Sequence, residues 1–249
     1  MTATPIPRTL AMTLYGDLDV SIIDDMPQKR LVKTIHCYDY DRERVFNFIY
    51  KEILNGYQVY IIYPIIGYSQ KTNLKSLLIE YNKIIQSSIL HKCRISILHG
   101  NMGYKSKIKS MNDFLNKKSD IMIATTAIEV GIHIPNVSVI LIENSEQFGL
   151  SQLHQLRGRI GRNSINSYCI LMTSKTISQK AKMRINTMKQ MHNGFDIANV
   201  DLKIRGPGNF SGIEQSGMIK LKIANLYKDI NILSLSKEAA HEYIMSKKN

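Results

Sequence analysis

Short apolar segments alternate with amphipathic segments through the first 173 residues of the chain. Apolar runs of strand length predict β-strands, and these runs lie at 33–40, 58–65, 94–100, 120–126, 137–143 and 168–173. Between them, apolar residues that recur every three or four positions predict helices at 41–55, 73–89, 104–117 and 149–160. Strands that alternate with such helices indicate an α/β fold, in which helices cover both faces of a parallel sheet.

The pattern changes after Thr173, where strand-like runs stop. A helix is expected at 178–193, followed by an irregular stretch at 194–217 and then by one or two further helices. The irregular stretch is rich in glycine, which disfavours a regular helix and favours a loop that can move. A passive surface loop is the alternative interpretation of the same stretch.

The composition is that of an ordinary globular chain, with 44% apolar residues in 249. No apolar run approaches the roughly 20 residues of a membrane span, and no signal-peptide pattern is present, so a cytoplasmic location is expected. The cysteines, Cys37, Cys93 and Cys169, lack the spacing of a zinc site or a disulfide framework. We therefore expect buried thiols and no metal site.

The net charge of +13 comes from 33 Lys and Arg against 20 Asp and Glu, and it favours a polyanionic partner. Lys, Ile and Asn are all abundant, however, as in proteins from AT-rich genomes. Charge alone therefore leaves nucleic-acid binding and an ordinary solvated surface equally open.

A dense arginine cluster follows the strand expected at 137–143. The segment "LHQLRGRIGR" at 153–162 places Arg157, Arg159 and Arg162 within six residues, together with two glycines. Ligands of open parallel sheets bind outside the carboxyl ends of the strands, and the planar guanidinium group suits phosphate. The cluster thus indicates a phosphate site at that edge, with a solvated basic helix end as the alternative.

Three segments together resemble superfamily 2 helicases: "LHQLRGRIGR" is similar to motif VI, "IATTAIEVGIHIPN" to motif V and "TATPIPRTL" to motif III. Three more resemble the RecG family of bacterial ATP-dependent DNA helicases, which remodel replication forks and Holliday junctions. These are "TLYGDLDVSIID", "ILHGNMGYKSKIKSMNDF" and "DLKIRGPGNFSGIEQSG". The last is similar to the translocation motif that this family shares with the transcription-repair coupling factor. The resemblance covers nearly the whole chain and implies a RecA-like sheet.

The resemblance also implies a division of the chain. Residues 1–30 would be the end of helicase lobe 1 with motif III and a linker, 31–175 the RecA-like second lobe with motifs IV to VI, and 176–249 a helical hairpin with the translocation motif and C-terminal helices. Neither a G-x-x-x-x-G-K-[ST] phosphate loop nor a D-E-x-H or D-E-A-D box occurs, and "GYSQKT" at 67–72 lacks the second glycine. The resemblance thus implies that the sequence lacks the junction-binding wedge domain and most of lobe 1. These parts would have to be supplied in cis or in trans.

We therefore expect a chain that needs lobe 1 for activity, and that alone does not hydrolyse ATP. The partners implied are ATP with Mg²⁺, whose ligands belong to lobe 1, and branched or duplex DNA, without a membrane. Two alternatives stay open: a module that grips duplex DNA without turnover, and an inactive fragment of a split gene.

The family motifs assign roles by position. For the nucleotide, Arg159 and Arg162 would stabilise charge on the transferred phosphate, with Gln155 as a neighbouring contact or a plain surface residue, and with Gly131 and His133 of motif V nearby. His133 stands where the family usually has Asp or Asn, so a structural histidine is equally open. Residues implied in DNA contact and coupling are Thr2, Thr4, His99, Gly100, Thr125, Thr126, Glu129, Arg205 and Gln215. Asn101, Asn199 and Asn209 replace charged residues of the family.

Overall fold

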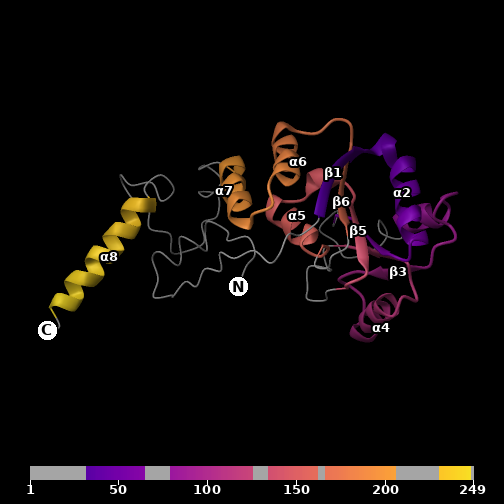
Figure 1. The fold of residues 1–249 in the computed structure, drawn as a ribbon, viewed down its shortest axis with the longest axis horizontal. Coiled ribbons are helices and arrows are strands. Elements are labelled where there is room, and N and C mark those ends of the chain that lie inside the picture. Colours follow the sequence, from indigo (N-terminus) through magenta and orange to yellow (C-terminus); the bar gives the residue numbers. More distant parts are fainter. Residues whose placement is uncertain (1–31, 65–78, 126–133, 162–165, 206–229, 248–249) are drawn as a thin grey trace.

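A computed structural model describes residues 32–64, 79–125, 134–161, 166–205 and 230–247 (Figure 1). The first part of the chain forms β1 (Val32–Tyr38), α2 (Arg42–Leu54), β2 (Gln58–Ile62), β3 (Ile95–Leu98), α4 (Tyr104–Leu115), β4 (Ile121–Ala124), β5 (Val137–Ile142), α5 (Leu150–Arg157) and β6 (Ser167–Thr173). Three helices follow: α6 (Gln179–Gln190), α7 (Gly194–Arg205) and α8 (Ile230–Ser246). None of the helices in these ranges is long and apolar enough to cross a membrane.

The six expected strands form one sheet in the order β1-β6-β5-β2-β4-β3, and every neighbouring pair is parallel. This confirms the α/β prediction. The chain leaves β2 toward β3 on one side and leaves β5 toward β6 on the other, so the topology switches direction between β2 and β5. β3 is an edge strand, and its outer side is not paired with any strand in the described ranges.

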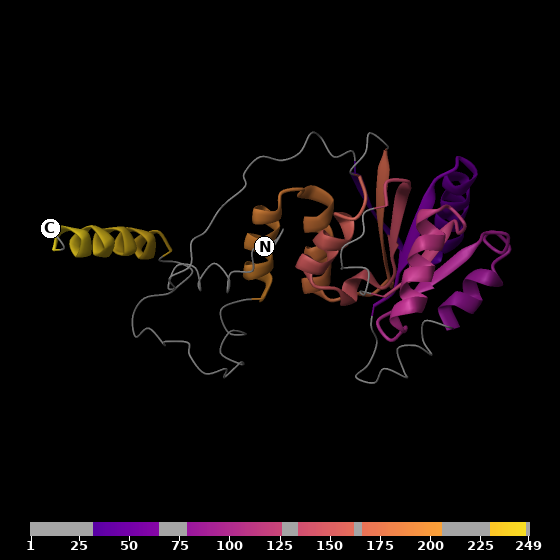
Figure 2. The ribbon, with the colours of Figure 1, turned by 90° about the horizontal axis from the view of Figure 1, so that it is seen from below.

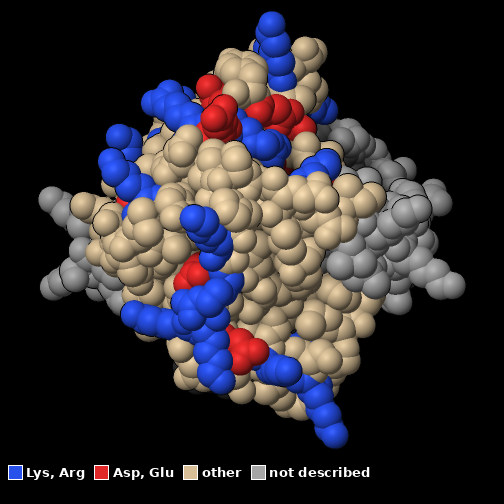
Figure 3. All heavy atoms as spheres, turned by 90° about the vertical axis from the view of Figure 1, so that its right-hand side faces the viewer, with Lys and Arg blue, Asp and Glu red and all other residues tan. Residues whose placement is uncertain are grey.

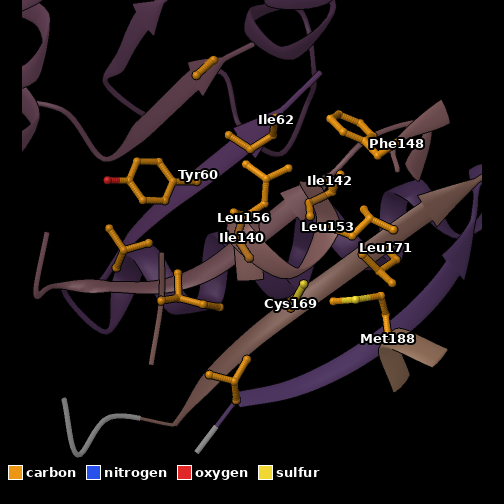
Figure 4. Packing of buried hydrophobic residues seen from close by; sticks show 14 of the residues in the cluster. Tyr60, Ile62, Ile140, Ile142, Phe148, Leu153, Leu156, Cys169, Leu171 and Met188 are labelled. Atoms are coloured by element: carbon orange, nitrogen blue, oxygen red, sulfur yellow. The ribbon is translucent and has the colours of Figure 1, made fainter. Parts of the chain in front are cut away.

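Helices cover both faces of the sheet, as Figure 2 shows. Because side chains alternate along a strand, β2 sends Tyr60 and Ile62 to one core and Val59 and Ile61 to the other. The first core is closed by α4, α5, α6 and α7, and the second by α2 and a helical segment at 79–85. Figure 4 shows the first core. Its labelled residues are Tyr60, Ile62, Ile140, Ile142, Phe148, Leu153, Leu156, Cys169, Leu171 and Met188.

The stretch after α6 corrects one prediction. Residues 194–205 were expected to be irregular, but they form α7. Glycine occurs here only at Gly194, where the helix begins, while buried Ile197, Asp201 and Ile204 recur at helical spacing against the sheet-facing core. The glycine-rich part proper begins at Gly206, outside the described residues.

Two smaller expectations also changed. The helix expected at 149–160 ends at Arg157, because Gly158 caps it and Arg159 N–H donates to the Leu156 carbonyl in a tighter turn. Of the three cysteines, Cys169 is fully buried as predicted, whereas Cys37 and Cys93 are only half-buried.

Candidate functional site

Three of the residues assigned to DNA contact lie together where β3 and β4 end. The two strands pair at Leu98 and Ala124, and Thr125 N–H donates to the Leu98 carbonyl at 3.2 Å. His99 and Gly100 follow directly, and Lys107 Nζ of α4 donates to the Gly100 carbonyl at 2.7 Å. Burial, and secondarily the Lys107 charge, lower the pKa of His99. The carboxyl edge of β3 and β4 therefore holds a neutral histidine, a lysine-anchored glycine turn and a threonine.

The arginine segment lies elsewhere, contrary to the expectation that it would occupy the same edge. After β5, α5 runs back across the sheet, anchored by Leu150, Leu153 and Leu156 in the core. Gly161 then packs beside Val32 and Ser167, which are the first residues of β1 and β6. Arg159, two residues earlier, thus lies toward the amino ends of the strands.

Gly161 is required at this point for two separate reasons. Its φ of +72° lies in the left-handed region, where side chains are disfavoured. In addition, a Cβ at this position would lie 2.0 Å from Val32 Cγ2. Glycine therefore lets the chain turn from α5 toward β6 while packing directly on the start of β1.

The first two arginines of the segment differ in what they contact. Arg157 is only 5% exposed, and its Nη1 donates to the carbonyls of Met188 (2.7 Å) and Met191 (2.8 Å). It ties the end of α5 to the end of α6. Burial raises the pKa of Tyr60, and the positive charge of half-buried Arg159 offsets part of that rise. Arg157 is therefore a structural residue, which its place in the motif did not reveal.

Replacing Arg157 tests that assignment. Arg157→Met keeps most of the side-chain volume but leaves the two carbonyls without their donor, so we expect a loss of about 1–3 kcal/mol in the free energy of unfolding. Urea unfolding followed by circular dichroism measures it. An unchanged midpoint would show that the two hydrogen bonds do not stabilise the α5–α6 junction.

An ion pair between a partly exposed arginine and a buried glutamate occupies the switch point between β2 and β5, and sequence reasoning missed it. Glu143, directly after β5, is 1% exposed, and Arg42 of α2 donates to both of its carboxylate oxygens, with Nη2 to Oε2 at 2.9 Å. Tyr63, directly after β2, is buried beside the pair, and burial raises the pKa of its hydroxyl well above the usual value. This is where open α/β sheets usually bind ligands. Here the Arg42–Glu143 pair lies at that point, whereas the arginine segment lies at the other edge.

The described residues at the two ends of motif V lie at opposite edges of the sheet. Thr125, 5% exposed, ends the described part of β4 at the carboxyl edge. The described chain resumes at buried Ile134, and Asn136 Nδ2 donates to the Gly56 carbonyl at 2.9 Å just before β5 begins. Because β4 and β5 are both parallel to β2, Thr125 lies at the carboxyl edge of the sheet and Asn136 at the amino edge.

The remaining predicted residues are only partly placed. Gln155 is half-buried on α5, and Arg205 is the last residue of α7. The others lie outside the described residues: Thr2, Thr4, Thr126, Glu129, Gly131, His133, Arg162 and Gln215.

Comparisons with known proteins show which family the chain is similar to. The family model "Helicase conserved C-terminal domain" matches residues 43–164, and "ATP-dependent DNA helicase RecG, domain 3, C-terminal" matches 191–249. Proteins named ATP-dependent DNA helicase RecG are similar to the chain: that of Synechocystis sp. is 44% identical over 100% of this chain and 30% of its own length, and that of Borreliella burgdorferi 42% over 96% and 34%. The chain thus spans about a third of the length of these relatives.

A solved structure shows the same arrangement. The structure of RecG bound to a three-way DNA junction superposes with a TM-score of 0.72 at 38% identity, over 94% of this chain and 30% of that one. The sheet and its helices therefore follow the architecture of that helicase.

Proposed function

Because the chain belongs to the RecG family of ATP-dependent DNA helicases, of which it represents a C-terminal portion, we propose that it is the second motor lobe of an enzyme that couples ATP hydrolysis to the remodelling of branched DNA. The observation that carries the proposal is motif V, whose ends lie at opposite edges of one sheet. One edge holds the residues proposed for DNA, and the other holds Arg159. A single segment can therefore transmit a change at the nucleotide to the DNA.

At the amino edge, Arg159 and Arg162 would contact the transferred phosphate, with Gln155, Gly131 and His133 nearby. The half-buried guanidinium of Arg159 fits this role, because burial of its surroundings lowers the local dielectric constant and strengthens its attraction for an anion. ATP supplies the phosphoryl group when bound, and the Mg²⁺ ligands are proposed to lie in lobe 1. The arginines would stabilise charge as it develops.

At the carboxyl edge, His99 and Gly100 would contact the DNA backbone, and Thr125, Thr126 and Glu129 of motif V would couple that contact to the nucleotide. Such contacts position a protein without reading sequence, as an enzyme acting on junctions of any sequence requires. Arg205 ends α7 and would anchor the translocation motif that contains Gln215, while Thr2 and Thr4 would couple the lobes. A cytoplasmic location, the proposed division at 31–175 and 176–249, and a role in repair and recombination follow from the same proposal.

A chimaera tests the function. The Synechocystis relative, with this chain replacing its matching 250 residues, is expected to release phosphate in a DNA-stimulated manner and to unwind a three-way junction, whereas this chain alone does neither. Both are measured at saturating ATP, with the unmodified relative as the control. Turnover of roughly 1–10 per second by this chain alone, or a folded chimaera that binds the junction without hydrolysing ATP, would overturn the proposal.

A further inference from the structure

The outer face of α4 carries exposed basic and aromatic side chains. Tyr104, the first residue of the helix, is 79% exposed, and Lys105 and Lys109 are exposed one turn apart on the same side. Lys117 and Lys118 follow the helix and are also exposed. Figure 3 looks onto the side of the molecule where α4 lies, and Lys and Arg gather over its lower half with few acidic residues between them. We refer to Tyr104, Lys105, Lys109, Lys117 and Lys118 as the α4 face.

The charge of this region is unbalanced. Residues 91–120 hold seven Lys and Arg against two Asp, Asp113 and Asp120. Asp120 is bound by Arg94 at 2.6 Å, and Asp113 lies 3.8 Å from Lys118. No ion pair among the described residues involves Lys105, Lys109 or Lys117. A dense positive surface of this kind attracts polyanions.

The α4 face continues the carboxyl edge outward. α4 begins four residues after Gly100, and Lys107, on its inner side, holds the Gly100 carbonyl. From there α4 runs beside the edge strand β3 for about 17 Å, at 1.5 Å per residue. Each strand of duplex DNA carries about five phosphates over that length. Lys105 and Lys109 lie about 6 Å apart along the helix axis, which is about two phosphate steps of one strand.

Exposed apolar residues offer another reading of the same surface, since Ile108 and Leu115 lie on the outer side of α4 as well. Both are only partly exposed, at 41% and 47%, and lysines flank them. A protein partner would have to bury these ammonium groups or pair each of them, at a cost in desolvation. A phosphate backbone neutralises them at the surface, so the charge favours DNA.

We propose that the α4 face is a second DNA-backbone contact, beyond the His99–Thr125 edge, in which Lys105 and Lys109 bind phosphates and the Tyr104 hydroxyl donates to a phosphate or sugar oxygen. The identity of the partner rests on the proposed function.

Salt dependence of binding tests this directly. Binding of the chain to a duplex and to a three-way junction is measured by fluorescence anisotropy without nucleotide, between 50 and 200 mM salt. The slope of log K against log salt is negative, and each lost phosphate contact on duplex DNA reduces its magnitude by roughly 0.9. We expect Lys105→Gln/Lys109→Gln to reduce this magnitude by about 1.8, and Lys105→Arg/Lys109→Arg to restore it.

Lys51 is exposed on α2, which covers the opposite face of the sheet. Lys51→Gln is therefore the control and is expected to leave the slope unchanged. A drop of about 0.9 for Lys51→Gln, half that of the double variant because one charge is removed in place of two, would mean that only net charge matters. An unchanged slope for the double variant would overturn the proposal. Weaker association of Ile108→Ser with a lobe 1 fragment, at unchanged DNA slope, would instead identify a protein contact. Because no nucleotide is present, failure here is distinct from failure of ATP hydrolysis in the chimaera.

Discussion

In the chimaera, Arg159→Ala is expected to lower kcat for DNA-stimulated ATP hydrolysis by roughly 10³-fold or more, as loss of a transition-state arginine does in related NTPases. The reason is that negative charge on the transferred phosphate shifts as the bond to the leaving group breaks, and a fixed cation stabilises it most at that moment. Nucleotide affinity should change far less, because the interaction is made mainly in the transition state. Arg159→Lys should recover little, since an ammonium lacks the planar pair of donors.

Steady-state kinetics and equilibrium nucleotide binding, measured on one preparation, separate the two effects. The Arg157→Met variant is the matched control within the same segment. The Arg157 side chain binds the Met188 and Met191 carbonyls, so its replacement should lower stability. It should leave kcat largely intact at temperatures where the protein is folded. Equal losses of kcat and nucleotide affinity in Arg159→Ala would show that this arginine only binds the nucleotide. A large kcat loss in folded Arg157→Met would remove the distinction between the two arginines.

The sheet was predictable because its strands are buried on both faces. All of β2, β4 and β5 are buried, so each appears in the sequence as an apolar run, with Gln58 and Ser138 as the only polar residues. The sequence did not predict α7, because the glycines near both of its ends led to the expectation of a loop. Ile197, Asp201 and Ile204 nevertheless form a helical face that packs on the core. A window that began after Gly194 would have shown that periodicity.

The site was harder to predict, because it depends on direction and on distant pairs. The rule that ligands bind at the carboxyl ends of strands applies to the residues just after a strand. The arginine motif lies at the end of α5, which runs back across the sheet, so the motif reaches the amino edge. The Arg42–Glu143 pair joins residues 101 positions apart, and neither residue carries a local signal. The motif assigned the phosphate role to Arg159 and Arg162 by position, whereas the structural role of Arg157 is visible only in the fold.

Gly161→Ala is expected to lower the free energy of unfolding by about 2–5 kcal/mol, the sum of about 1–2 for a left-handed backbone with a Cβ and about 1–3 for overpacking. The steric part arises because the new Cβ would overlap Val32 Cγ2 at the first pair of β1 and β6, Val32 with Ser167. Val32 is β-branched and buried, so its side chain has little freedom to move away.

The two parts can be separated with a second substitution. Val32→Ala removes the overlapping methyl group, so Gly161→Ala should cost less in the Val32→Ala background than in the parent chain, by about the overpacking share of 1–3 kcal/mol. Urea unfolding of the four proteins of this cycle measures the coupling. If the costs simply add, Val32 does not confine Gly161, and the backbone conformation alone explains the glycine. If Gly161→Ala costs nothing in either background, neither reason for a glycine between Arg159 and Arg162 holds.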